Sequence, residues 1–141
     1  MSDFSGIIKN KNFLIEKAQK QRDEISAILN DFFSAIKKDT DGKIQAKIHG
    51  FNPKNDKNIK LLYGVQFGKC DSILIQNSMR SVIIAFWSFD KYYGFPCSIT
   101  RGLNQIVCDS GEELKNALKD LLSDIAVLKE IDIMLVEQTK I

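Results

Sequence analysis

The stretch GVQFGKCDS at residues 64–72 closely resembles a phosphate-binding loop. That loop requires two glycines with four residues between them, then a lysine and a Ser or Thr whose hydroxyl binds magnesium. Here three residues separate Gly64 from Gly68, and Cys70 replaces the hydroxyl side chain. The next residues, SILIQ, favour a strand, whereas a phosphate loop needs the start of a helix. We therefore interpret the GKCD segment as a hairpin turn that Gly68 makes possible, and we expect no cofactor.

His49 is the single histidine of the chain, so any mechanism of the Ser-His or Cys-His type must use it. It shares a predicted strand face with Lys47, and local spacing places no nucleophile or carboxylate beside it. A histidine on a polar strand face is usually just solvated. Catalysis through His49 is therefore our third functional hypothesis, and the sequence favours a protein that is not an enzyme.

The three cysteines, Cys70, Cys97 and Cys108, are odd in number and lack a CxxC pair. This argues against both a disulfide framework and a structural zinc site, and a Cys3His site would need ligands from four separate strands or turns. Cys97 and Cys108 are expected to face each other across a hairpin whose turn is RGLN. We interpret both as buried thiols that fill the core of a cytoplasmic protein, and we predict no metal site.

A basic sheet face is the remaining candidate for a binding site. Basic groups interleaved with aromatic rings on an open sheet are typical of some proteins that bind single-stranded RNA or DNA. The signature of RNA-recognition domains is absent, however. The simpler alternative is a solvent-facing surface whose tryptophan lies in the core. The candidate binding residues are Lys47, His49, Lys60 and Gln66 on this face, with Arg80, Trp87, Tyr92 and Arg101 nearby.

The net charge of +2 conceals an uneven distribution along the chain. Residues 1–40 hold 7 basic and 6 acidic side chains, residues 41–105 hold 9 and 4, and residues 106–141 hold 4 and 8. The middle is thus +5 and the C-terminal segment −4. A basic excess of this size is far weaker than the dense stripe usual in proteins that bind nucleic acids.

The elements that must position these residues begin with a long helix over residues 12–38. Its apolar side chains recur on one helical face. They also form a nearly heptad stripe interrupted by Gln21, which is marginal for a coiled coil, so packing on a sheet is the simpler interpretation. DTDG at residues 39–42 ends the helix. The apolar positions are Leu14, Ala18, Ile25, Ile28, Leu29, Phe32 and Ile36.

Residues 43–108 alternate with the period of strands, and at least five strands are predicted there. In residues 43–51 the apolar side chains share one face, and Lys47 and His49 share the other. Residues 59–67 form a second half-buried strand. These segments predict a sheet that is polar on part of one side.

The stretch SVIIAFWSF at residues 81–89 is apolar on both faces of its predicted strand. Such a strand has to be covered on both sides. The following strand contains Pro96, which cannot donate to the ladder and therefore predicts an edge position or a bulge. If both long helices pack on one face of the sheet, the second apolar face is open, so either a helix crosses to it or another chain covers it.

SGEE at residues 110–113 predicts the start of the last helix, with Ser110 as N-cap and Glu113 completing a capping box. Residues 130–141 either extend this helix or form a second one, with a core-facing set at Ile131, Met134 and Leu135. The apolar stripe that follows the cap is Leu114, Leu118, Leu121, Ile125 and Leu128.

The predicted fold class is α+β, with a long N-terminal helix, an antiparallel sheet of five to six strands and a long C-terminal helix. These pack mainly as two layers, in a single domain over residues 1–141. The longest apolar run, Val82–Trp87, has six residues, so we expect no membrane segment and place the protein in the cytoplasm.

The preferred functional hypothesis is a non-catalytic protein-interaction module of the inhibitor, immunity, antitoxin or adaptor type. It would act through its sheet face or its N-terminal helix. We expect a protein partner or a homodimer, and no membrane. The alternative is binding of a nucleic acid or an anionic small ligand by the basic sheet face, which would weaken steeply as salt rises.

Overall fold

In the computed structural model, residues 4–51 and 70–139 are described. They form three helices and a five-stranded antiparallel sheet with the strand order β1-β2-β3-β4-β5, which confirms the predicted α+β class. None of the described helices combines the length and the apolar character needed to cross a membrane. The elements are α1 (Lys11–Asp39), β1 (Gln45–Phe51), β2 (Cys70–Gln76), β3 (Ser81–Asp90), β4 (Gly94–Arg101), β5 (Asn104–Cys108), α3 (Gly111–Ser123) and α4 (Ile125–Thr139).

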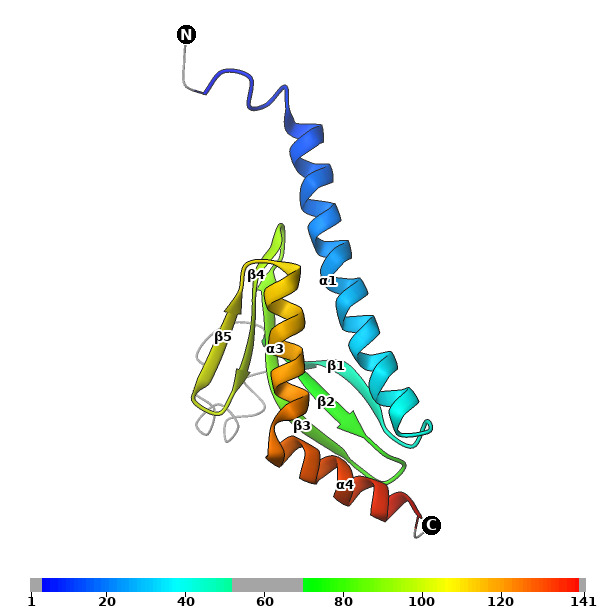
Figure 1. Cartoon of the computed structure of the whole chain (residues 1–141). Helices are drawn as coiled ribbons and strands as arrows, with labels where there is room; N and C mark the ends of the chain where they lie inside the picture. Colours follow the sequence, from blue (N-terminus) through cyan, green and yellow to red (C-terminus); the bar gives the residue numbers. More distant parts are fainter. Residues whose placement is uncertain (1–3, 52–69, 140–141) are drawn as a thin grey trace.

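The helices cover one face of the sheet (Figure 1). α1 and α3 contact each other on this face, and α4 follows α3 across the end of the sheet near the β2–β3 turn. Their buried side chains join those of the strands in one core, as the two-layer prediction requires. α1 contributes Ile25, Ile28, Leu29, Phe32 and Ile36. The sheet contributes, among others, Ile73, Ile75, Ala85, Trp87, Cys97 and Ile99.

β3 is covered on both faces, as its sequence predicts. Trp87 belongs to the helix-facing core and is 2% exposed, and Phe86, on the other side, is 3% exposed. The described helices all pack on the first face, so none of them crosses to cover Phe86. Phe86 is nevertheless buried in a single chain, so this residue does not need a second chain to cover it. The apolar face of β3 alone gives no reason for a partner.

The strand that contains Pro96 occupies an interior position. β4 pairs with β3 on one side and with β5 on the other, so the edge position is wrong and the alternative of a bulge is right. The pairing passes from Phe89 and Cys97 to Asp90 and Gly94, which shifts the register at this point. The missing N–H of the proline therefore falls where the ladder is already interrupted.

β2 begins at Cys70, within the segment interpreted as a turn. Asp71 pairs with Gly50 and Trp87 inside the sheet, so its assignment to a hairpin turn is wrong. A strand rather than a helix occupies residues 70–76, which agrees with the rejection of a phosphate loop. The predicted strand at residues 59–67 lies outside the described residues.

The C-terminal segment forms two helices. Asp124 ends α3 in an extended conformation, and its Oδ1 accepts hydrogen bonds from the N–H groups of Ala126 and Val127 at 2.9 and 3.3 Å, which starts α4. The new direction brings Val127 into the core and leaves Ile125 and Leu128 exposed. The predicted place of these two residues in the core stripe is therefore wrong.

The start of α3 has the predicted cap. The N–H of Glu113 donates to Ser110 Oγ at 3.3 Å, and the carboxylate of Glu113 accepts from the N–H of Asp109 at 2.6 Å. In α4, Met134 is buried and Ile131 is partly buried against the core, as predicted. The cap and this core set together fix both ends of the C-terminal segment on the sheet.

Cys97 and Cys108 lie directly opposite each other in the β4–β5 hairpin. Both are buried free thiols. Burial, reinforced by the neighbouring Cys108, raises the pKa of Cys97 to about 12, and burial also raises the pKa of Cys108. The interpretation of the pair as buried thiols is confirmed, and both stay protonated near neutral pH.

We expect these thiols to make stability fall in alkaline solution. The unfolded chain releases the Cys97 proton near pH 9.0, whereas the folded chain keeps it until about pH 12. The free energy of unfolding should therefore be unaffected by this group below pH 9.0 and fall above it, by about 1.4 kcal/mol per pH unit for one such proton. Urea unfolding across this range measures the slope. Cys97→Ala should show a shallower slope than the wild type, and equal slopes would contradict the assignment.

Candidate interaction surface

The predicted basic face is not assembled in the described chain. Lys47 and His49 are exposed on the side of β1 away from the helices, whereas Trp87 is buried on the helix-facing side. Tyr92 is exposed in the β3–β4 turn. Lys60 and Gln66 lie outside the described residues. Trp87 therefore cannot stack on a nucleotide base that binds next to Lys47.

The residues around His49 do not form a catalytic pair in the described part of the chain. Ser72 lies opposite it in β2, but Ser72 Oγ donates a hydrogen bond to the main-chain oxygen of His49 at 3.2 Å. The backbone thus engages the hydroxyl, and the imidazole does not. Within residues 4–51 and 70–139, no three His, Cys, Asp or Glu side chains are placed to hold a metal ion.

Arg101 is engaged within the protein. Its Nη1 donates to the main-chain oxygen of Ile84 at 2.9 Å, and its Nε lies 3.7 Å from Asp124 Oδ2. These contacts tie the end of β4 to β3 and to the break between α3 and α4. Arg101 therefore stabilises the fold, and both of these contacts use its guanidinium group.

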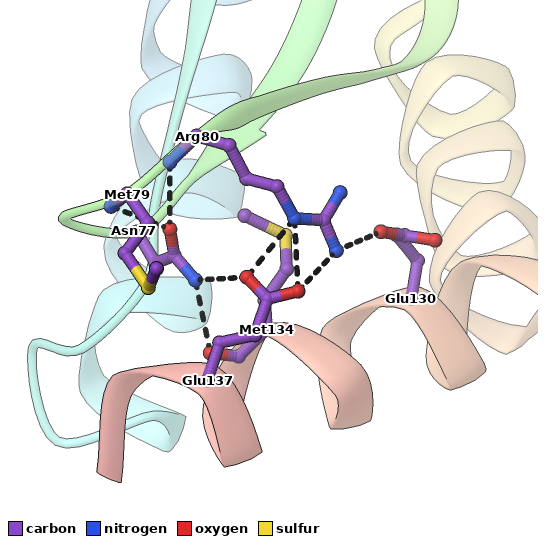
Figure 2. Close-up of polar contacts among 6 residues, drawn as sticks. All are labelled: Asn77, Met79, Arg80, Glu130, Met134 and Glu137. Atoms are coloured by element: carbon purple, nitrogen blue, oxygen red, sulfur yellow. Dashed lines mark hydrogen bonds and ion pairs between the residues drawn. The ribbon is translucent and has the colours of Figure 1, made fainter. Parts of the chain in front are cut away.

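Arg80 binds two carboxylates of α4 (Figure 2). Its Nη2 lies 2.6 Å from Glu130 Oε1 and 2.8 Å from Glu137 Oε1, and its Nε donates to Glu137 at 2.9 Å. Asn77 Nδ2 donates to the main-chain oxygen of Met134 at 3.0 Å, and Asn77 Oδ1 accepts from the N–H of Arg80 at 2.9 Å. This predicted binding residue is thus part of a clamp that fixes α4 to the β2–β3 turn.

The clamp shifts the pKa of both charged partners. Hydrogen bonding to Glu137, and then to Glu130, raises the pKa of Arg80. Hydrogen bonds from Arg80, and then from Asn77, lower the pKa of Glu137. The side chains of Arg80 and Glu137 are 38% and 27% exposed, so water screens much of their attraction.

The N-terminal part of α1 extends beyond the sheet (Figure 1). The buried residues of α1 all lie at Ile25 or later, and between residues 11 and 20 Ala18 alone is partly buried. We name residues 4–20 the overhang. Its large apolar side chains, which are 46–80% exposed, are Phe4, Ile7, Ile8, Phe13, Leu14 and Ile15.

The overhang continues the core-facing stripe of α1. Leu14 and Ala18 precede Ile25 by eleven and seven residues, spacings that return to the same side of a helix. The side that packs on the sheet from Ile25 onward is therefore exposed at Leu14. The prediction that this stripe packs on the sheet is right for its second half and wrong for Leu14.

The base of the overhang is held at a fixed point on the body of the protein. Arg22 Nη1 donates to the main-chain oxygen of Tyr92 at 3.0 Å, in the β3–β4 turn. Next to this contact, Gly94 has a φ of +83°, and a Cβ there would lie 3.0 Å from Ile25 Cδ1. The glycine thus permits both the turn and the close approach of α1.

The overhang is basic. It contains Lys9, Lys11, Lys17 and Lys20 against the single acid Glu16, which gives a net charge of +3. Lys11 and Lys17 are each three residues from Leu14, so they flank the exposed stripe on its two sides. An apolar strip bordered by lysines is therefore presented on this end of the helix.

A concave surface lies between α3 and the β4–β5 hairpin, and we name it the α3–β5 groove. This open groove has a volume of about 710 Å³. At its rim, Arg101 offsets the charge of Asp124, and no residue of the described chain pairs with the exposed Asp120. The residues that matter below are Ile106, Ala117 and Leu121 on the floor and Arg101, Asp120 and Asp124 at the rim.

Comparison with protein-family models gave no match, and searches of curated proteins and of solved structures gave no significant match. The functional argument therefore depends on the chain's own residues.

The predicted site residues did not include Phe13, Leu14 and Ile15. The sequence did contain a signal for them, because three consecutive apolar residues span about 200° of a helix, and packing on one sheet covers only part of that. The sequence predicts the N-terminal helix as an interaction surface, but it does not predict which half of the helix is left exposed by the sheet.

Replacement of Arg80 by Met should weaken the docking of α4, because Glu130 and Glu137 then lose their counter-charge. We expect the Tm to fall by a few degrees at low salt and by less at high salt. Because the folded protein lowers the pKa of Glu137 from 4.5, the contribution is present above that pH and lost as pH falls below it. Thermal unfolding followed by circular dichroism measures both effects.

Lys129→Met is the matched control for this prediction. Lys129 is an exposed residue of α4, the helix that Arg80 binds, and its replacement also removes one positive charge. Equal Tm values for the Arg80 and Lys129 variants would show that the clamp does not stabilise α4.

Proposed function

We propose that this protein is a non-catalytic interaction module that binds a partner protein through the overhang. The observation that supports this function is the exposure of large apolar side chains at Phe13, Leu14 and Ile15 and in the preceding turns. Contiguous apolar surface of this kind usually marks a site where another molecule binds. Inhibitors, immunity proteins, antitoxins and adaptors all act through such contacts without performing a reaction.

The overhang fits the mode in which an amphipathic helix enters a groove of its partner. Leu14 supplies the central anchor, and Phe13 and Ile15 widen the contact on its two sides. Lys11 and Lys17, on the borders of the stripe, favour acidic groups at the rim of that groove. The partner proposed here is therefore a protein with an apolar groove and an acidic rim.

Nucleic-acid binding is less well supported. Phosphate groups would contact the lysines of the overhang but leave its large apolar side chains in water. The sheet face with Lys47 and His49 lacks the stacking ring of Trp87, which is buried on the other side. Base stacking on aromatic side chains supplies much of the binding energy in proteins of that class.

Leu14→Asp should weaken partner binding without affecting the fold, because Leu14 is exposed and distant from the core. The partner is first isolated from the source cell with the full chain, and its Kd is then measured by titration calorimetry. We expect Leu14→Asp to raise the Kd by about tenfold or more. Asn12→Asp, the same new charge on the opposite side of the helix, should change it by less than about twofold.

The Tm of both variants should match that of the wild type, which separates lost binding from lost folding. A partner that binds Leu14→Asp as tightly as the wild type would contradict the proposal. A full chain that is strictly monomeric and also retains no protein from the source cell would contradict it as well.

A further inference from the structure

We infer that the occupant of the overhang is a second copy of this chain, which accepts the overhang in its α3–β5 groove. This inference rests on the proposed function, since it names the partner of the same surface. The argument uses the charge, the apolar surface and the position of the two sites.

The two sites have opposite charge. The overhang has four lysines and one glutamate, a net charge of +3, whereas the charged residues that line the groove are Arg101, Asp120 and Asp124, a net charge of −1. Asp120 stands exposed at the rim of the groove. Opposite potentials on two surfaces favour and orient their encounter, so one chain contains both halves of an attractive pair.

The two sites are also apolar where they would meet. Ile106, on the floor of the groove, is 41% exposed, and Leu103 at its lip is fully accessible to a partner. The groove, at about 710 Å³, lies within the range of about 300–1,000 Å³ that is usual for binding sites. Leu14 and a neighbouring apolar side chain would enter it, with Lys11 or Lys17 next to Asp120.

Other arrangements of two copies are electrostatically worse. Pairing of one overhang with another would bring two sets of lysines together. The β5 edge is uncharged and has exposed side chains at Ile106 and Val107, but pairing it with its own copy about a two-fold axis would bring the acidic side of α3, with Asp120, toward itself. Of these three arrangements, the one that pairs opposite charges is the overhang of one copy in the groove of the other.

The contact has to form between chains. The overhang projects beyond one end of the sheet, whereas the groove lies near the β4–β5 turn and the C-terminal half of α3, at the other end (Figure 1). A helix anchored by Arg22 cannot fold back to its own groove. Two copies can satisfy both contacts at once, each giving its overhang to the other.

Reversal of charge on each surface tests this contact. The full chain is compared, by analytical ultracentrifugation, with the overhang variant Lys11→Glu/Lys17→Glu and with the groove variant Asp120→Lys. We expect a wild-type mass of twice 16.0 kDa and at least about tenfold weaker association for each variant alone. An equimolar mixture of the two variants should restore the dimer, because every overhang then meets a groove of opposite charge. Asp132→Lys, on exposed α4 surface outside the groove, should associate as the wild type does.

A wild-type chain that stays monomeric at about a hundred micromolar would overturn this inference, and so would a mixture of variants that fails to associate. Its failure can be told apart from failure of the proposed function. The wild-type chain could instead be monomeric and bind a different protein, and Leu14→Asp could abolish that binding. This result would refute the second copy as the occupant but would support the proposed interaction module.

Discussion

The burial of the C-terminal half of α1 on the sheet is the interaction on which the rest of the structure depends. Five of its side chains, from Ile25 to Ile36, are buried, and each contributes about 1.5–3 kcal/mol. At about 1.5 Å per residue the 29 residues of α1 span about 44 Å, whereas the 10 residues of β3, the longest described strand, span about 33 Å. A straight helix fixed at its C-terminal half therefore projects beyond the sheet.

The same burial explains why residues 11–20 of the overhang are helical without a core of their own. An isolated helix of this length is marginal in water, because its first turn is costly to form. Residues 11–20 instead add turns to a helix that already exists from Ile25 onward, and each added residue gains a backbone hydrogen bond. The contact of Arg22 with the β3–β4 turn then sets the direction of the projecting segment. Apolar side chains at Leu14 and its neighbours are thus held in one geometry before any partner arrives.

Local periodicity was sufficient to predict most of the described elements and the two faces of β1, where alternation alone placed His49 on the exposed side. It could not predict features set by distant segments. Ile125 keeps the helical spacing of the preceding stripe, so the break at Asp124 is invisible to periodicity and becomes clear only from the hydrogen bonds that Asp124 accepts. The candidate site was predicted less well for the same reason. The face of Trp87 depends on strand register, and the carboxylates that bind Arg80 come from a helix 50 and 57 residues further along the chain.

The separation of charge along the chain acquires a physical meaning once the fold is known. A mixture of both signs over the whole surface would be enough for solubility. Here the basic overhang projects at one end of the molecule, whereas α4 and the C-terminal end of α3, with Asp120, lie at the other end, too far from the overhang to stabilise it through salt water. Between two molecules the same charges come within reach. In the proposed contact the apolar side chains around Leu14 supply most of the affinity, because they are removed from water. The lysines supply the specificity, because they are attracted to Asp120 and are repelled by apolar surfaces with basic side chains at their rim.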